Sequence, residues 1–154
     1  LTLCNWVWPM AMSPTKSRDY RGDLDLEAKF MKAVTGLDYT TEDLYKAGAK
    51  IMTLQRANTA RGMTDETGAM GVNDFRNIHD VYTEWPFTKD PDIPVFAEGT
   101  DKMDKDDIQT GLTMVYECFG WDPELGCPTA ECLDYYDMPD VKADLAALGL
   151  LPDA

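Results

Sequence analysis

The amino-acid sequence predicts a mainly α fold, an irregular multi-helix domain with a long wrapping loop. Several stretches carry apolar residues at steps of three and four, the period of an amphipathic helix, and most of them end at glycine. Residues 63–101 show no sustained period and are rich in glycine and proline. The first observation predicts the helices, and the second predicts the loop.

The clearest helix is predicted over residues 40–61. Thr40 is a suitable N-cap, Asp43 completes a short capping box, and Gly62 is expected to end the helix in the left-handed conformation. The face expected to be buried consists of Leu44, Ala47, Ile51, Leu54 and Asn58. An aspartate at position 51 should therefore unfold the domain.

Four further helical segments are predicted from caps and apolar stripes. They cover residues 23–35, 104–119, 129–136 and 139–148. Their expected apolar faces are Leu26, Phe30, Ala33 and Val34 in the first, Ile108, Leu112, Val115 and Phe119 in the second, and Val141, Leu145 and Leu148 in the last. The first is expected to pack on the 40–61 helix as a hairpin. Inside the loop we expect a short helix or turn near 73–79 and a brief strand at 81–85.

Length and charge limit the possible functions. A chain of 154 residues fits a single domain, 1–154, and its net charge of −14 opposes binding to nucleic acid or anionic lipid. No apolar run approaches the roughly 20 residues of a membrane span. We expect a cytoplasmic protein. The chain does not begin with Met, and we expect it to be a processed product or a fragment of a longer protein.

The first twelve residues are apolar and uncharged, with tryptophans at Trp6 and Trp8. Such a terminus is expected to be covered by the rest of this domain, by the missing cofactor-binding part of a larger protein, or by a second copy in a homodimer through residues 1–12.

Few side chains are candidates for a catalytic or ligand-binding role. His79 stands beside Asp80, and it is interpreted either as a general base or, more simply, as a surface or capping residue. Arg56 and Arg61 could meet an anionic ligand but are expected to pair with carboxylates of this chain. The acidic run 101–107 lacks the glycine and glutamate of a calcium loop and is interpreted as a solvated helix start.

The four cysteines are Cys4, Cys118, Cys127 and Cys132. Cys118 falls in a helix pattern and is expected to be a small buried residue. Cys127 and Cys132 lack a second ligand pair at zinc-finger spacing. The sequence alone therefore predicts no complete metal site.

Two segments resemble the C-terminal domain of the aldehyde ferredoxin oxidoreductases. In residues 33–62, AVTGLDYTTEDLYKAGAKIMTLQRANTARG, the matching positions are Val34, Thr35, Gly36, Leu44, Gly48, Ile51, Leu54, Arg56, Asn58, Arg61 and Gly62. Lys50 stands where the family usually has Arg, and Ala57 where it usually has Phe. The second segment is YECFGWD at 116–122, followed by Pro128, Thr129 and a closing LGL at 148–150.

The resemblance extends to the N-terminus. The family has a D-x-x-G-L-C segment there, of which Leu3 and Cys4 match while Thr2 replaces the glycine. It implies that Leu3, Cys4 and Asn5 bind the cofactor and that Cys4 is the fourth ligand of a [4Fe–4S] cluster. A buried structural cysteine is the alternative for Cys4.

For the parent enzyme, the resemblance implies oxidation of an aldehyde with water to a carboxylic acid. Electrons would pass from a tungsten or molybdenum bis-pterin through the [4Fe–4S] cluster to ferredoxin. The family's catalytic residues lie upstream, so no residue of this chain is expected to be catalytic, and the isolated chain is expected to be inactive and free of cofactors. A related branch reduces aromatic coenzyme A thioesters. The alternative is a free-standing acidic helical protein-interaction module without catalytic activity.

Overall fold

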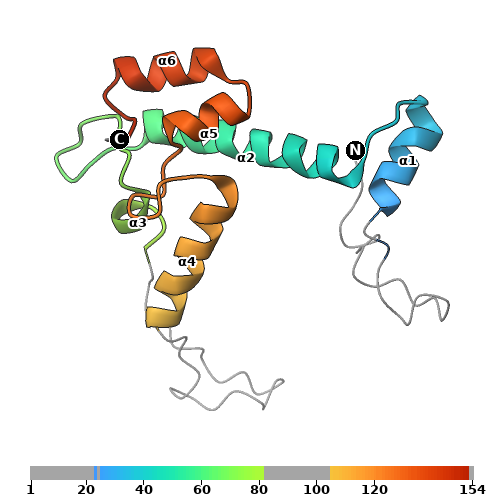
Figure 1. Cartoon of the computed structure of the whole chain (residues 1–154). Coiled ribbons are helices and arrows are strands. Elements are labelled where there is room, and N and C mark those ends of the chain that lie inside the picture. The colour runs from blue at the N-terminus through green and yellow to red at the C-terminus, as the bar shows by residue number, and fades with distance from the viewer. Residues whose placement is uncertain (1–22, 24, 82–104, 153–154) are drawn as a thin grey trace, which may run out of the picture. The chain divides into compact units, whose positions relative to one another are not determined.

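The computed structural model describes residues 23, 25–81 and 105–152 (Figure 1). Its helices are α1 (Leu26–Thr35), α2 (Thr41–Gly62), α3 (Phe75–Ile78), α4 (Lys105–Phe119), α5 (Ala130–Tyr135) and α6 (Pro139–Ala147). Within these residues the only β pairing is two isolated bridges, Thr64 with Met70 and Trp121 with Pro128. The mainly α prediction is confirmed. None of the described helices is both long enough and apolar enough to cross a membrane.

The chain divides into two compact units, residues 1–51 and 52–154. We call them unit 1 and unit 2. The described part of unit 1 is α1 with the first half of α2, and that of unit 2 runs from the second half of α2 to α6. The assignment of residues 1–154 to one domain of a larger enzyme stays a prediction.

Local caps fix most of the helix ends close to their predicted positions. Thr40 and Asp43 form the expected capping box, with Asp43 N donating to Thr40 Oγ1 at 3.1 Å and Thr40 N donating to Asp43 Oδ2 at 2.9 Å. Gly36 follows α1 in the left-handed conformation, φ 73°. Gly62 differs from the prediction, since it is the last helical residue of α2 and its φ is not positive. α1 begins three residues after the predicted start at residue 23, and its N-cap is Asp25.

The faces of the unit 1 helices are less buried than predicted. Val34 of α1 is 79% exposed, whereas Ala28 is buried. The two helices are joined by a hydrogen bond in which Thr41 Oγ1 donates to Asp25 Oδ1 at 2.7 Å. This bond joins the N-terminal ends of the two helices, which otherwise pack little on each other in the described residues, so the predicted packing of the two helices as a hairpin is wrong.

Unit 2 has a core built from small residues of α2 and larger ones from the second half of the chain. Its fully or nearly fully buried members are Thr53, Ala57, Ala60, Val72, Phe75, Tyr116, Trp121, Cys127, Pro128, Cys132, Leu133, Tyr136, Met138, Leu145 and Leu150. The buried hydroxyl of Thr53 accepts a hydrogen bond from Trp121 Nε1 at 3.1 Å. This bond satisfies two polar groups that would otherwise be costly inside the core.

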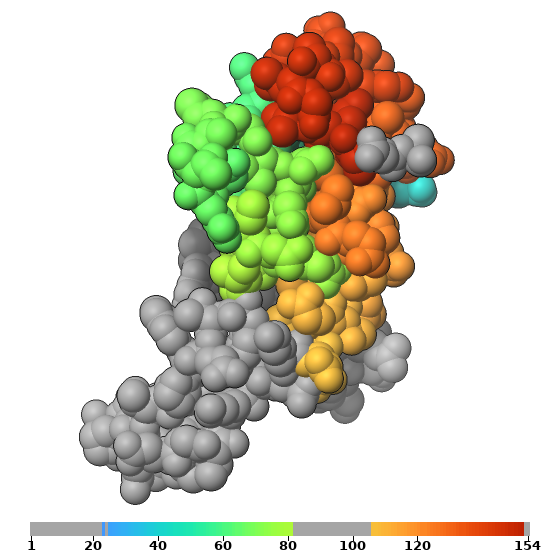
Figure 2. All heavy atoms as spheres, turned by 90° about the vertical axis from the view of Figure 1, so that its left-hand side faces the viewer, coloured from blue at the N-terminus to red at the C-terminus, as the bar shows by residue number. Residues whose placement is uncertain are grey.

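The segment after α2 wraps over unit 2, as the sequence predicts for its described part, residues 63–81. Val72 N donates to Ala60 O at 2.8 Å, and Phe75 N donates to Leu125 O at 2.7 Å. Figure 2 shows this segment in green, beside the orange turn-rich corner that follows α4 and the red C-terminal helices. The short helix predicted near 73–79 is α3. Val81 is in no strand, and the rest of the strand predicted at 81–85 lies outside the described residues.

The apolar faces predicted for α4 and α6 are only partly buried in the structure. In α4, Ile108, Leu112 and Phe119 are half-buried but Val115 is exposed, and the fully buried residue is Tyr116. In α6, Leu145 is buried and Leu148 is exposed. Gly120 and Gly149 end these helices with φ 70° and 66°, as predicted.

The predicted buried face of α2 is wrong. Ile51 is 58% exposed and Leu54 is exposed as well, while Ala57 is 1% exposed. The buried side consists of Thr53, Ala57 and Ala60, because the helix is packed closely through small residues rather than through its large apolar ones.

This correction reverses the expected effect of a charge on α2. Ala57→Asp should unfold unit 2, since an unpaired buried charge costs several kcal/mol against a total stability of about 5–15 kcal/mol. Ile51→Asp should change the free energy of unfolding by less than about 1 kcal/mol. Urea unfolding of both variants measures the difference. Equal destabilisation would contradict the packing described here.

Candidate functional site

The best-defined polar site in the described residues is centred on Arg56 of α2. Its guanidinium lies 3.9 Å from the centroid of the Phe75 ring and 4.7 Å from that of Trp121. A guanidinium is planar and weakly hydrated, so aromatic faces stabilise it well where water is excluded.

The N–H groups at the edges of the guanidinium also have hydrogen-bond acceptors. Nε donates to the carbonyl oxygen of Gly126 at 2.9 Å, and Nη1 donates to Asp80 Oδ1 at 3.2 Å. Nη2 donates to the second carboxylate oxygen of Asp80. Arg56 thus joins α2 to the end of the α3 segment and to the corner at 120–128. The interpretation that Arg56 and Arg61 pair with carboxylates of this chain is confirmed, as Arg61 Nη1 lies 3.2 Å from Asp144 Oδ2.

Asp80 gathers three donors. Besides Arg56, it accepts a hydrogen bond from Tyr116 Oη at 2.7 Å, and His79 Nδ1 lies 2.6 Å from its Oδ1. Partial burial acts to raise the pKa of Asp80, but the hydrogen bonds from Arg56, His79 and Tyr116 outweigh it and hold the pKa below its usual value of 3.8. Because the carboxylate stays ionised, His79 Nδ1 is the donor in this contact.

Tyr116 ties α4 to the same cluster. Burial, the hydrogen bond to Asp80 and the negative charge of Asp80 together raise the pKa of Tyr116 to about 12. Its ring lies against Gly126, where φ is +75° and a Cβ would stand only 2.6 Å from the ring carbon Cζ. Any side chain at Gly126 would therefore displace Tyr116. No pattern in the residues around Gly126 indicates this role.

His79 is a capping residue of α3. Its backbone N–H donates to Phe75 O at 3.0 Å, and its ring meets the Phe75 ring edge-on with centroids 5.7 Å apart. The imidazole is half exposed, and Asp80 fixes its orientation. The capping interpretation is thus confirmed.

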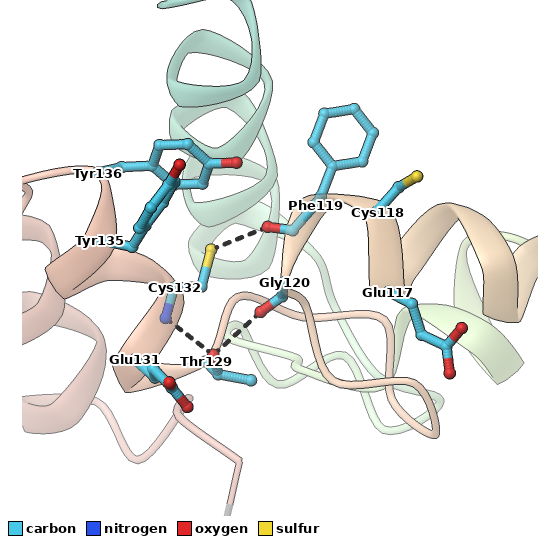
Figure 3. Close-up of a pocket in the computed structure, with 9 residues that line it drawn as sticks. All are labelled: Glu117, Cys118, Phe119, Gly120, Thr129, Glu131, Cys132, Tyr135 and Tyr136. Atoms are coloured by element: carbon cyan, nitrogen blue, oxygen red, sulfur yellow. Dashed lines mark hydrogen bonds between the residues drawn. The ribbon is translucent and has the colours of Figure 1, made fainter. Parts of the chain in front are cut away.

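A separate pocket lies between α4 and α5, with a volume of ≈480 Å³ (Figure 3). It is lined by Glu117, Cys118, Phe119, Gly120, Thr129, Glu131, Cys132, Tyr135 and Tyr136. Thr129 Oγ1 caps α5 by accepting from Cys132 N at 3.0 Å, and it donates to Gly120 O at 3.0 Å. Cys132 Sγ donates to Phe119 O at 3.2 Å.

The described thiols do not form a metal centre. Burial raises the pKa of Cys127 to about 12 and that of Cys132 to about 11, so both remain protonated near neutral pH. Cys118 is exposed, which corrects the expectation that it is buried. In residues 23, 25–81 and 105–152, no three His, Cys, Asp or Glu side chains are placed to hold a metal ion.

The predicted cofactor residues Leu3, Cys4 and Asn5 lie outside the described residues. Their roles stay predictions. Of the acidic run 101–107, the described residues Asp106 and Asp107 form the exposed first turn of α4, as a solvated helix start should.

Residues 1–138 match the family model for aldehyde ferredoxin oxidoreductase, domains 2 & 3. The chain belongs to this family. The structure is also similar to a solved structure described as the active site complex BamBC of benzoyl coenzyme A reductase in complex with 1,5 dienoyl-CoA. That match has a TM-score of 0.53 and 25% sequence identity, and it covers 85% of this chain and 16% of that chain. The present chain therefore spans only a small part of that relative.

The segments that resemble the aldehyde ferredoxin oxidoreductases come together in the Arg56 cluster. Arg56 belongs to the 33–62 segment, and Tyr116 and Trp121 belong to the 116–122 segment. In this member of the family, these motif residues serve packing and charge pairing within unit 2.

Removing the charge of Asp80 should destabilise unit 2. Asp80→Asn leaves Arg56 partly buried without a counter-ion and should cost about 2 kcal/mol near neutral pH. The matched control is Asp134→Asn, because Asp134 forms an exposed pair with Lys142 at 2.6 Å that should contribute less than about 1 kcal/mol. Urea unfolding measures both.

The same variant should alter how the free energy of unfolding falls at acidic pH. A carboxyl whose folded pKa lies below 3.8 contributes stability that is present above that pH and is lost as the pH falls through the folded pKa. Asp80→Asn should flatten this loss below about pH 4. An unchanged acid limb would show that Asp80 is not held ionised by the cluster.

Alkali should weaken unit 2 through Tyr116. Its pKa is raised from 10.0 to about 12, so the stabilisation of its protonated form is complete below pH 10 and is lost as the pH rises through about 12. Burial also raises the pKa of Tyr136. Spectrophotometric titration should therefore show late-ionising tyrosines, and Tyr116→Phe should reduce their number by one. Unfolding is followed in parallel, so that ionisation is compared only where the chain is folded. An unchanged number of late-ionising tyrosines in the variant would contradict the assignment.

Proposed function

We propose that this chain is the C-terminal part of a larger oxidoreductase that carries a tungsten or molybdenum bis-pterin and a [4Fe–4S] cluster. The observation that supports it most strongly is the family match over residues 1–138. Electrons released at the metal would leave one at a time through the cluster.

Cys4 is the proposed contact of this chain with the cluster, and Leu3 and Asn5 are the proposed contacts with the pterin. The described part of the chain provides no competing set of ligands, since its buried thiols are protonated and no metal-binding group is present there. A cubane needs four ligands. The others would come from the rest of the enzyme, which we propose as the main partner of this chain.

The proposed reaction is oxidation of an aldehyde with water to a carboxylic acid, two protons and two electrons, with ferredoxin as the acceptor. We assign no catalytic residue to this chain. Its described residues would support the enzyme by fixing α2, the α3 segment and α4 around Arg56. Location in the cytoplasm and a homodimer through residues 1–12 stay predictions.

A second reaction is favoured by one observation, the similarity to the BamBC complex of benzoyl coenzyme A reductase. It is the reduction of an aromatic coenzyme A thioester. The full-length protein, purified without oxygen, can be assayed in parallel for aldehyde-dependent reduction of a viologen dye and for reductant-dependent loss of benzoyl-CoA. Activity in one assay alone identifies the branch, and inactivity of metal-loaded protein in both would contradict the proposal.

The role of Cys4 can be tested by iron content. Cys4→Ala in the full-length protein should lower bound iron by about four atoms per protein, the content of one [4Fe–4S] cluster, and remove its electron paramagnetic resonance signal. Cys118→Ala is the control, as Cys118 is an exposed free thiol whose loss should leave iron unchanged. Full iron content in Cys4→Ala would assign Cys4 to a structural role and support the rival view of this chain as an interaction module.

A further inference from the structure

The described part of unit 1 has almost no core of its own. Within residues 23 and 25–51, Ala28 is the only buried hydrophobic side chain. Several large apolar side chains of this part are exposed, namely Val34, Leu37, Tyr45 and Ile51. Helices in proteins are stabilised mainly by tertiary packing of an apolar face. The exposure therefore indicates that α1 and the first half of α2 have a packing partner outside the described residues.

One face of the first half of α2 carries three positions of the family pattern. Leu44, Gly48 and Ile51 are separated by four and three residues, so they lie on the same side of the helix, with Ala47 beside them. Leu44 is half-buried, and the other three are exposed. We call these four uncharged residues the Gly48 face. None of them contacts Arg56 in its cluster, so the packing of the described residues does not account for them.

Gly48 provides an independent observation. A glycine inside a helix destabilises it relative to alanine, yet Gly48 stands in the interior of the 22-residue helix α2. A Cβ added to Gly48 would meet no atom of the described residues within 4 Å, apart from the adjoining backbone of α2. Glycine is the residue that allows another backbone to approach closely. The open space in front of Gly48 therefore indicates close approach by a segment that is not among the described residues.

We propose that the Gly48 face is the surface on which the preceding part of the parent enzyme packs. The occupant is an apolar, uncharged segment whose backbone lies against Gly48 and whose side chains cover Leu44 and Ile51. This inference rests on the proposed function only in requiring that a larger enzyme exists. The chain covers 16% of the solved relative, so most of an enzyme of that size lies outside this chain.

Two other occupants fit less well. A second copy would bring together two chains that each carry a net charge of −14, and their mutual repulsion opposes pairing. Residues 1–12 of the same chain are apolar, but we have proposed that Leu3, Cys4 and Asn5 contact the cofactors, which would hold this segment elsewhere. The preceding part of the enzyme is subject to neither objection.

The substitution Gly48→Ala distinguishes a free face from a covered one by the sign of its effect. On a free helix face alanine is more stabilising than glycine, so the melting temperature of the isolated chain should rise. Against a closely approaching backbone the added methyl group clashes, so the melting temperature of the full-length protein should fall. A rise in both proteins would overturn the proposal.

Hydroxyl-radical footprinting of the wild-type protein checks the same surface without a substitution. Ile51 is 58% exposed and Ile78 is 38% exposed, so Ile51 should be oxidised faster than Ile78 in the isolated chain. Ile78 is the matched control, because it has the same side chain and does not belong to the Gly48 face. In the full-length protein the order should reverse, with Ile51 oxidised more slowly than Ile78. An order that does not reverse would contradict the proposal.

The isolated chain also identifies the other occupants. Protection of Ile51 there, or a lower melting temperature of Gly48→Ala there, would assign the face to residues 1–12 if it is independent of protein concentration and to a second copy if it is not. Either result overturns the proposal. Neither measurement requires bound metal or turnover. An inactive full-length protein with Ile51 covered would contradict only the proposed reaction, and an active one with Ile51 accessible would contradict only the docking surface.

Discussion

A partly buried positive charge organises unit 2. The Arg56 guanidinium needs a counter-ion and hydrogen-bond acceptors for its N–H groups, and the ring faces stabilise it further. A charge withdrawn from water is costly unless it is paired and its N–H groups are hydrogen-bonded. Phe75 and Asp80 come from the α3 segment, and Trp121 and the carbonyl of Gly126 come from the corner at 120–128. Each segment is thereby fixed relative to α2. The small residues that α2 contributes to the core bury little area of their own, so this charged centre helps to specify the arrangement beside apolar burial.

Local chemistry explains why the helices could be predicted. A capping box at Thr40, a left-handed Gly36 and a proline at the start of α6 each act within a few residues. The buried faces could not be predicted in the same way. Periodicity identifies an apolar face but not the neighbour that covers it, and this chain spans 16% of its solved relative. Ile51 and Leu54 carry the strongest apolar signal of α2, yet the core is reached through Ala57 and Ala60.

Some residues of the Arg56 cluster can be identified from the sequence, but their contacts with one another cannot. The sequence marks Arg56 and the His79–Asp80 pair as separate candidates, but nothing local indicates that Arg56 meets a carboxylate 24 residues away. The requirement for glycine at position 126 cannot be predicted from the sequence, because it comes from the Tyr116 ring and not from the residues adjacent to Gly126 in the chain. The pocket likewise depends on how α4 and α5 approach each other. Cys4 was named from family resemblance, and its environment lies outside the described residues.

The separation of these contacts along the chain has a consequence for biosynthesis. Arg56 reaches Gly126 across 70 residues, and Trp121 reaches Thr53 across 68. Closing such loops costs entropy before any contact repays it, and non-local contacts slow folding. On the ribosome, α2 must therefore wait until the corner at 120–128 has emerged before it acquires its partners. During that interval Arg56 has neither the carbonyl of Gly126 nor the ring of Trp121 beside it.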